Sequence, residues 1–311
     1  MSAGKTIVIG TRGSALARWQ AAEIGRLLRA GDPDLVVTER IIVTAGDRSQ
    51  TGPVGDLGGK SVWVQEIEDA LSSGEVDLAV HSMKDVPTDL AAGLAIVAVP
   101  SRADPRDAIV SRSGAGLDAL APGSRVGTSS LRRVCQLRAA RGDLSIEILR
   151  GNVDTRLRKV AEGVVDAAVL AAAGLDRLGF SARIAERLDP ERMLPAIGQG
   201  ALALEARADD ARVVGLCRAL SDPGAETTVA AERALLAGLG VGCRTPVAGY
   251  ATLADGRLTV AGLVGRPDAS EMIAETVTGE PGDAAALGAD LARRLLARGA
   301  DRILRDLEIR A

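Results

Sequence analysis

The first two-thirds of the chain alternates short apolar runs with segments whose apolar residues recur at helical spacing. Strand-like runs lie at residues 7–9, 35–43, 76–80, 94–99, 125–127, 146–149 and 167–170. Helical spacing covers residues 14–30, 62–71, 131–140, 153–161 and 209–220. Strands that alternate with helices in this way predict α/β layers with largely parallel sheets.

Two proline-bounded stretches, residues 100–105 and 195–200, interrupt this alternation. Such stretches are typical of connections between domains. They predict that the chain leaves a first doubly wound α/β lobe, builds a second, and then returns. The predicted domains are residues 1–100 with 200–220, and residues 101–199.

The last part of the chain has a different pattern. A helical segment at 225–239 precedes strand-like stretches at 247–253, 258–264 and 273–278, and a closing helix is expected around Leu291. Asp255-Gly256, between the first two stretches, is a strong hairpin signal. We therefore expect a small α+β domain with an antiparallel sheet over residues 221–311.

Composition narrows the class of protein. A length of 311 residues predicts two or three domains. With 38 basic against 41 acidic residues, the net charge of −3 disfavours a general nucleic-acid binder. Lysine stands at only four positions, so the remaining 34 basic residues are arginine, whose guanidinium group binds carboxylates and phosphates bidentately. A codon bias toward Arg and Ala would produce the same excess.

The three cysteines, Cys135, Cys217 and Cys243, form neither a disulfide framework nor a metal-ligand spacing with the single His81. The amino terminus lacks the pattern of a signal peptide, and no apolar run is long enough to cross a membrane. We therefore expect a cytoplasmic protein without a bound metal. Cys135 and Cys217 lie on predicted helices, where a position in the core is expected.

Three predicted strands end in turns of small, hydroxyl and arginine residues. These turns are Gly10–Ser14, Gly127–Arg133, and Arg150–Asn152 with Arg156. Free N–H groups at helix N termini favour anions, and ligands of open α/β sheets gather at the carboxyl ends of strands. Ser, Thr and Asn are also ordinary helix caps, but three such turns together favour a cleft with several anion-binding sites.

A fourth strand leads into His81-Ser82-Met83-Lys84-Asp85, followed by Pro87. A carboxylate beside cations ionises readily and can accept hydrogen bonds or carry protons. A plain surface Lys–Asp pair is the alternative. Lys60 lies in a glycine-rich stretch over 51–61, which predicts a mobile loop over the cleft; the spacing does not match a phosphate-binding P-loop.

Cys243 has a different context from the other cysteines. Gly240 and Gly242 leave room for a bulky group beside its sulfur, and Arg244 favours the thiolate. Cys243 is therefore a candidate nucleophile or attachment point. The alternative is a loop cysteine without a role.

These motifs, taken in order over essentially the whole chain, resemble the porphobilinogen deaminase (hydroxymethylbilane synthase) family. The matching segments are 11–14, 80–87, 104–108, 127–133, 149–152, 194–200 and 242–243. The resemblance implies a transferase of tetrapyrrole (porphyrin and haem) biosynthesis. Such enzymes condense four porphobilinogen molecules head to tail, release ammonia, and free hydroxymethylbilane by hydrolysis. The resemblance also implies two lobes like those of type II periplasmic binding proteins, with a third domain that carries a cofactor.

The family's cofactor is a covalent dipyrromethane, bonded as a thioether to a cysteine that matches Cys243. Asp85 matches the catalytic aspartate, which would hydrogen-bond pyrrole N–H groups, stabilise positive charge and assist proton transfer. Further residues are expected to bind the carboxylates of cofactor or substrate. These are Arg12, Ser14, Lys60, Ser82, Lys84, Thr128, Ser129, Ser130, Arg132, Arg133, Arg150, Gly151, Arg156, Arg177 and Gln199.

Two positions depart from the family pattern. Asp56 stands where members often have Lys, and Trp63 replaces a frequent Phe. The resemblance implies a monomer whose partners are porphobilinogen and its oligopyrrole chain, with no nucleic acid and no membrane.

Residue patterns alone leave two other classes of protein open. A solute-binding or ligand-sensing protein would show the same two α/β lobes, and it would give Cys243 no role. A nucleic-acid module would use Arg132, Arg133, Arg156 and Arg158, but the net charge and the 1% content of aromatic residues disfavour it.

Overall fold

The computed structural model describes residues 6–48, 64–241 and 245–308. The chain divides into two compact units, residues 1–102 with 201–226, and residues 103–200 with 227–311. It passes from one unit to the other within residues 100–105 and again directly after Gly200. A third passage lies inside helix α8 (Pro223–Leu239).

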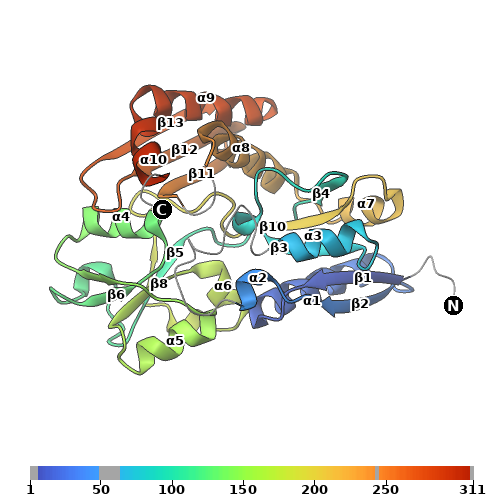
Figure 1. The fold of residues 1–311 in the computed structure, drawn as a ribbon, viewed down its shortest axis with the longest axis horizontal. Helices are drawn as coiled ribbons and strands as arrows, with labels where there is room; N and C mark the ends of the chain where they lie inside the picture. Colours follow the sequence, from blue (N-terminus) through green and yellow to red (C-terminus); the bar gives the residue numbers. More distant parts are fainter. Residues whose placement is uncertain (1–5, 49–63, 242–244, 309–311) are drawn as a thin grey trace. The chain divides into compact units, whose positions relative to one another are not determined.

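The first unit contains a five-stranded sheet in the order β2-β1-β3-β10-β4 (Figure 1). Its strands are β1 (Thr6–Thr11), β2 (Val36–Ile41), β3 (Leu78–Ser82), β4 (Leu94–Ala98) and β10 (Leu202–Arg207). β1 runs parallel to β2 and β3, whereas β10 runs antiparallel to β3 and β4. The strand that returns from the second unit therefore enters the middle of the first sheet.

Helices cover both faces of this sheet. α1 (Ala15–Gly31) and α7 (Ala211–Arg218) pack on one face, where Ile24 and Leu204 belong to one apolar core. α3 (Gln65–Ser72) packs on the other face, around Ile67 and Ala79. The short helix α2 (Ala45–Arg48) follows β2. This layering leaves the carboxyl ends of β1 and β3 to carry a site.

The sheet of the second unit has the order β7-β6-β8-β5-β9. Its strands are β5 (Asp107–Ser111), β6 (Arg125–Gly127), β7 (Ser145–Glu147), β8 (Ala167–Ala171) and β9 (Glu186–Leu188). β6 is parallel to β7 and β8, but β5, the first strand after the crossing, is antiparallel to β8 and β9. The prediction of largely parallel sheets is wrong for β5 and β10, since each enters its sheet from the opposite end.

The remaining helices of this part are α4 (Leu131–Ala140), α5 (Val153–Ala161) and α6 (Ala172–Arg177). Short 3₁₀ turns complete the connections: η3 (Met83–Asp85) in the first unit, and η4 (Leu117–Ala119), η5 (Ser181–Arg183) and η6 (Pro281–Asp283) in the second. Gly200 has φ +89°, and a side chain there would collide with the carbonyl oxygen of Ala103. Glycine is therefore required where the two crossing segments of the second unit meet.

The second unit also holds an antiparallel sheet of β11 (Val247–Ala254), β12 (Arg257–Gly265) and β13 (Met272–Gly279). Asp255 and Gly256, at φ 51° and 70°, form the turn of the predicted hairpin, which is confirmed. α8, α9 (Ala284–Ala297) and α10 (Ala300–Glu308) pack against one face of the sheet through a shared apolar core.

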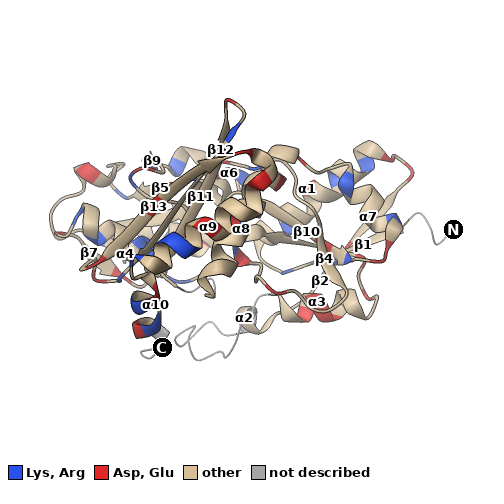
Figure 2. Cartoon of the chain, turned by 90° about the horizontal axis from the view of Figure 1, so that it is seen from above, with Lys and Arg blue, Asp and Glu red and all other residues tan. Residues whose placement is uncertain are grey.

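The fold class predicted from the sequence is confirmed: two α/β lobes and a smaller part with an antiparallel sheet. The three predicted domain boundaries stay a prediction, because the second α/β sheet and the antiparallel sheet lie within one compact unit. Acidic and basic residues are interspersed over the helices, as on α10 (Figure 2).

Candidate active site

A pocket opens in the first unit at the carboxyl ends of β1 and β3. Its described lining comes from the turn after β1, the first turns of α1, the end of β3 with η3, and the start of α3. The lining residues are Arg12, Ser14, Leu16, Ala17, Gln20, Val64, Ile67, Val80, His81, Ser82 and Asp85. Four residues that the sequence predicts as site residues, Arg12, Ser14, Ser82 and Asp85, therefore come together here.

Side-chain hydrogen bonds fix the two turns that form this pocket. The Ser14 hydroxyl caps α1, accepting the N–H of Ala17 at 3.3 Å. The buried Gln20 amide donates to the Ser82 hydroxyl at 2.9 Å and so links α1 to the end of β3. Gln20 is not among the residues predicted from the sequence, although a polar residue on the buried face of a helix is a signal for such a role.

Asp85 ends the turn that follows β3. Met83 anchors this turn, because its side chain is buried and its N–H donates to the carbonyl oxygen of Ala201 at 3.0 Å. The N–H of Val86 closes the turn on the Met83 carbonyl oxygen. Asp85 is exposed and lines the pocket together with Arg12. The pocket thus combines a carboxylate with cationic and hydroxyl groups.

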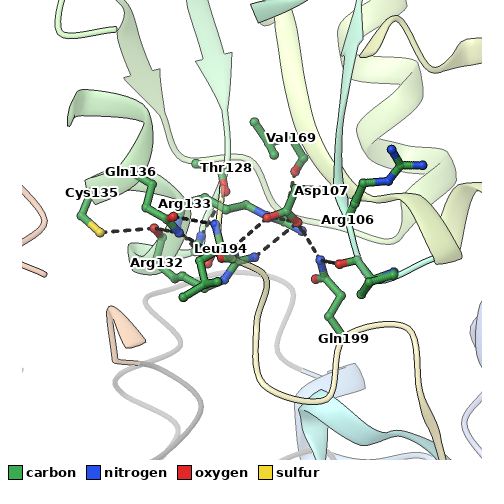
Figure 3. Close-up of polar contacts among 12 residues, drawn as sticks. Arg106, Asp107, Thr128, Arg132, Arg133, Cys135, Gln136, Val169, Leu194 and Gln199 are labelled. Carbon is green, nitrogen blue, oxygen red and sulfur yellow. Dashed lines mark hydrogen bonds and ion pairs between the residues drawn. The ribbon is translucent and has the colours of Figure 1, made fainter. Parts of the chain in front are cut away.

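The second unit buries a charged cluster around Asp107, the first residue of β5 (Figure 3). The Asp107 carboxylate is fully buried and accepts hydrogen bonds from Arg132 at 2.7 Å, Arg133 at 2.7 Å and Gln199 at 2.9 Å. Further guanidinium N–H groups donate to the carbonyl oxygens of Leu194 and Val169. Two buried cations therefore share one buried anion.

The charges of this cluster decide its ionisation. Burial alone would raise the pKa of the Asp107 carboxyl, but the guanidinium charges of Arg132 and Arg133 outweigh burial and hold that pKa well below its ordinary value. Arg132 and Arg133 are 3% and 6% exposed. The carboxylate that these arginines contact in the structure is the chain's own Asp107. Their expected contact with a ligand stays a prediction.

Other predicted site residues of the second unit lie in the turns after β6 and β7. Ser130 caps α4 by accepting the N–H of Arg133 at 3.4 Å, and Thr128 accepts the N–H of Ser130 at 3.2 Å. The Ser129 hydroxyl donates to the carbonyl oxygen of Leu149 at 2.7 Å. These hydroxyl groups hold the two turns in place, as the alternative of ordinary caps predicts.

The turn that begins at Arg150 is shaped by Gly151. Gly151 has φ +111°, and a side chain there would press on Thr155, 2.7 Å away, so glycine is required. The Arg156 guanidinium donates to the Gly151 carbonyl oxygen at 2.7 Å, and Lys159 donates to that of Arg150 at 3.2 Å. Arg150 and Arg156 are both half-buried.

Gln199 lies in the returning crossing, and the side chain of Arg177, at the end of α6, reaches the same segment. Arg177 donates to the Gly200 carbonyl oxygen at 2.8 Å, and Gln199 donates to that of Pro105 at 2.7 Å. Burial lowers the pKa of Arg177 to about 10, so its guanidinium group remains charged at neutral pH. Both side chains bind main-chain atoms of the crossing segments, and their roles toward a ligand stay predictions.

Some predictions lie outside the described residues: Lys60 and Cys243, with the departures at Asp56 and Trp63. Lys84, which the sequence places beside Asp85, is half-buried. Cys135 and Cys217 are fully buried, as predicted. Burial raises the pKa of their thiols to about 11 and about 12, so neither is a thiolate at neutral pH.

Asp107 and Glu205 are charged residues of these sites that are not among the site residues predicted from the sequence. Asp107 stands in a matching motif, but nothing in the sequence shows that Arg132 and Arg133 pack on it. Glu205 interrupts an apolar strand, and an acidic residue at such a position is a signal for a buried polar partner. The nucleic-acid alternative loses support, because Arg132 and Arg133 are buried and the exposed Arg158 pairs with Glu162.

No helix in the described ranges combines the length and the apolar character needed to cross a membrane. Among the same residues, no cluster of His, Cys, Asp or Glu is arranged to hold a metal ion.

The first pocket, with its carboxylate, arginine and hydroxyl groups on an α/β frame, is typical of a protein that binds an anionic ligand. Residues 7–215 match the family model described as "Porphobilinogen deaminase, dipyromethane cofactor binding domain", and residues 226–297 match "Porphobilinogen deaminase, C-terminal domain". The chain belongs to the porphobilinogen deaminase family, whose members are transferases of tetrapyrrole biosynthesis.

Individual relatives cover nearly the whole chain. A porphobilinogen deaminase of Syntrophobacter fumaroxidans is 48% identical over 303 residues, which are 97% of this chain and 98% of that protein. One of Sorangium cellulosum is 50% identical over 293 residues, covering 93% and 98%.

Two solved structures show weaker likeness. The effector-binding domain of BenM with benzoate is 14% identical at a TM-score of 0.41, covering 68% of this chain and 88% of that one. The aliphatic sulphonate binding protein SsuA from Escherichia coli is 14% identical at a TM-score of 0.40, covering 75% and 70%.

Proposed function

We propose that this protein is a hydroxymethylbilane synthase in which Asp85 is the catalytic carboxylate and Cys243 anchors the dipyrromethane. The observation that carries this proposal is the position of Asp85, exposed at a pocket that it shares with Arg12, Ser14 and Ser82. Membership of the porphobilinogen deaminase family supports the substrate, porphobilinogen.

The groups that line the pocket fit a dipyrromethane chemically. A dipyrromethane carries carboxylate arms, which suit the Arg12 guanidinium and the hydroxyl groups of Ser14 and Ser82. It also carries pyrrole N–H groups, which donate to a carboxylate such as Asp85. When bound, the dipyrromethane supplies the primer to which pyrrole units are added.

The protein's own residues then have distinct tasks. Arg12 binds and orients carboxylate arms, together with further arginines that the family resemblance assigns. The Asp85 carboxylate accepts pyrrole N–H hydrogen bonds and stabilises the positive charge that develops on porphobilinogen as ammonia leaves. In this proposal it also assists removal of the proton from the pyrrole carbon that forms the new bond.

Replacement of Asp85 tests this proposal. We expect Asp85→Ala to fold normally and to lower kcat by about 10²- to 10⁴-fold, the usual contribution of a positioned acid–base group. Asp69→Asn is the matched control, because Asp69 is exposed on α3 and its carboxylate hydrogen-bonds only Gln65 among the described residues. Wild-type turnover in Asp85→Ala would reject Asp85 as the catalytic group.

The remaining assignments are part of the same proposal. Lys60, Lys84, Arg150 and Arg156 are proposed carboxylate-binding residues. A monomeric state, a cytoplasmic location and the absence of nucleic-acid or membrane partners are carried forward as predictions from the sequence.

A further inference from the structure

Three ionisable side chains lie together behind the pocket of the first unit. His81 on β3 is 6% exposed and lines the pocket, and its Nε2 lies 2.9 Å from Oε2 of Glu205 on β10. Glu205 is fully buried. Glu68, on the helix α3 that packs on both strands, is 4% exposed and interacts with Glu205. The cluster therefore links α3 to the strand that leads into Asp85.

One buried carboxylate oxygen of this cluster has no hydrogen-bond partner among the described residues. Oε2 of Glu205 is occupied by His81, but Oε1 is buried and has no hydrogen-bond partner among the described residues. Oε1 of Glu68 accepts the N–H of Ala91 at 3.3 Å. A buried carboxylate oxygen without a partner is costly, and a proton on the neighbouring Glu68 carboxyl would supply the missing donor.

The electrostatics of Glu68 agree with a retained proton. Burial and then the charge of Glu205 raise the pKa of the Glu68 carboxyl. The four strands that contact α3 are β1, β3, β4 and β10. Their only ionisable side chains besides His81 and Glu205 belong to Arg207 of β10, which donates to the main-chain oxygens of Leu71 and Val76. Arg207 is therefore bonded elsewhere, and His81 and Glu205 are the ionisable side chains of the described strands that act on Glu68.

We propose that Glu68 is protonated and donates a hydrogen bond to Oε1 of Glu205, and that the resulting network of Glu68, Glu205 and His81 positions the turn that carries Asp85. In this arrangement Glu205 is a charged acceptor, and the Nε2–H of His81 donates to it. Glu68 and Glu205 are positioning residues, since they act through His81 and the end of β3. The expected effect of this network on turnover rests on the proposed function, whereas the hydrogen bond between Glu68 and Glu205 does not.

The network has a defined pH dependence. The proton leaves Glu68 as pH rises through its raised pKa, and two adjacent carboxylates then repel each other. The stabilisation that the protonated form provides is therefore present at low pH and lost on the alkaline side. Glu68→Gln keeps a donor to Oε1 at every pH, so we expect near wild-type kcat and the loss of this one pH-dependent step. Glu205→Gln removes the charge that holds His81, and we expect about a 10-fold lower kcat with little change in KM.

Two spectroscopic readouts on the full-length holoenzyme test this hydrogen bond without reference to turnover. At a pH above the ordinary pKa of a glutamic acid, the wild-type infrared spectrum should still show the carbonyl band of a protonated carboxylic acid, which Glu68→Gln removes and Asp69→Asn keeps. His81 is the only histidine of the chain, so the imidazole ¹⁵N signals need no assignment. Glu205→Gln should shift them strongly and Glu68→Gln only slightly.

Either of two results overturns the proposal. One is the absence of the carboxylic-acid band that depends on Glu68 in the wild-type protein. The other is a Glu68→Gln variant whose imidazole signals and kcat change as much as those of Glu205→Gln. Full turnover in Asp85→Ala would instead reject the proposed function and leave these spectroscopic results standing.

Discussion

The buried cluster around Asp107 makes a strong prediction about stability. Asp107→Asn keeps the size and shape of the side chain but removes its negative charge. Arg132 and Arg133 would then remain buried without a counterion, although their hydrogen bonds to the carbonyl oxygens of Leu194 and Val169 persist. The change therefore isolates the effect of charge from that of packing.

The expected loss follows from the burial of all three groups. Removing one partner of a buried ion pair typically costs about 3–5 kcal/mol, because the remaining charge stays desolvated. For a unit of this size, each kcal/mol corresponds to roughly 2–4 °C in Tm, so we expect a fall of about 6–20 °C. Asp189→Asn is the control, since its carboxylate is 68% exposed and pairs only at the surface with Arg106; its effect should stay below about 1 kcal/mol.

Thermal unfolding followed by circular dichroism measures both variants. The difference in Tm between wild type and Asp107→Asn should be constant from about pH 8 to pH 5. The pKa of Asp107 is depressed in the folded protein, so the stability that its charge contributes is complete above the ordinary Asp pKa near 3.9. That contribution is lost as pH falls through the folded-state pKa. The difference in Tm between the two proteins therefore narrows only in stronger acid. A loss below about 1 kcal/mol in Asp107→Asn would refute the view of the cluster as a desolvated ion network.

Two further predictions concern buried groups of the chain. Under native conditions a thiol reagent should label neither Cys135 nor Cys217, because both thiols are buried and burial raises their pKa to about 11 and about 12. After denaturation of the holoprotein, the reagent should label two thiols per chain. Three labelled thiols would contradict the linkage at Cys243. Glu232 is fully buried and accepts hydrogen bonds from the N–H groups of Gly198 and Ala251. Glu232→Ala leaves both donors unpaired, so it should lower the free energy of unfolding by roughly 2–5 kcal/mol in a denaturation experiment. An unchanged denaturation midpoint would contradict this role.

Local patterns predict the helices best. α4 and α5 begin and end at the predicted residues, because Ser130 and Asn152 stand at their N-cap positions and the apolar spacing runs to the last turn. β5 and β10 are not among the predicted strands, although their apolar runs resemble those of the strands that are predicted. Their antiparallel direction depends on the path of the whole chain.

Contacts between residues that are far apart in the sequence limit how much of the candidate site can be predicted from the sequence. The sequence identifies Arg132 and Arg133 as carboxylate-binding residues, but Asp107 lies 25 residues before Arg132 and only the folded chain brings them together. Likewise, His81 is noticed for its turn, whereas its partner Glu205 is 124 residues away. Side chains within one turn, such as Asp85 and Ser82, are predictable because the chain itself keeps them close.

The proposed covalent dipyrromethane is tested most directly by intact-mass spectrometry of the denatured holoprotein, which measures the mass of the chain with its cofactor in one step. The wild-type chain should weigh more than its sequence by one dipyrromethane, and Cys243→Ser should match its sequence mass and lack hydroxymethylbilane synthesis. A wild-type protein that makes hydroxymethylbilane at full rate with the mass of its sequence alone would contradict a covalent cofactor at Cys243.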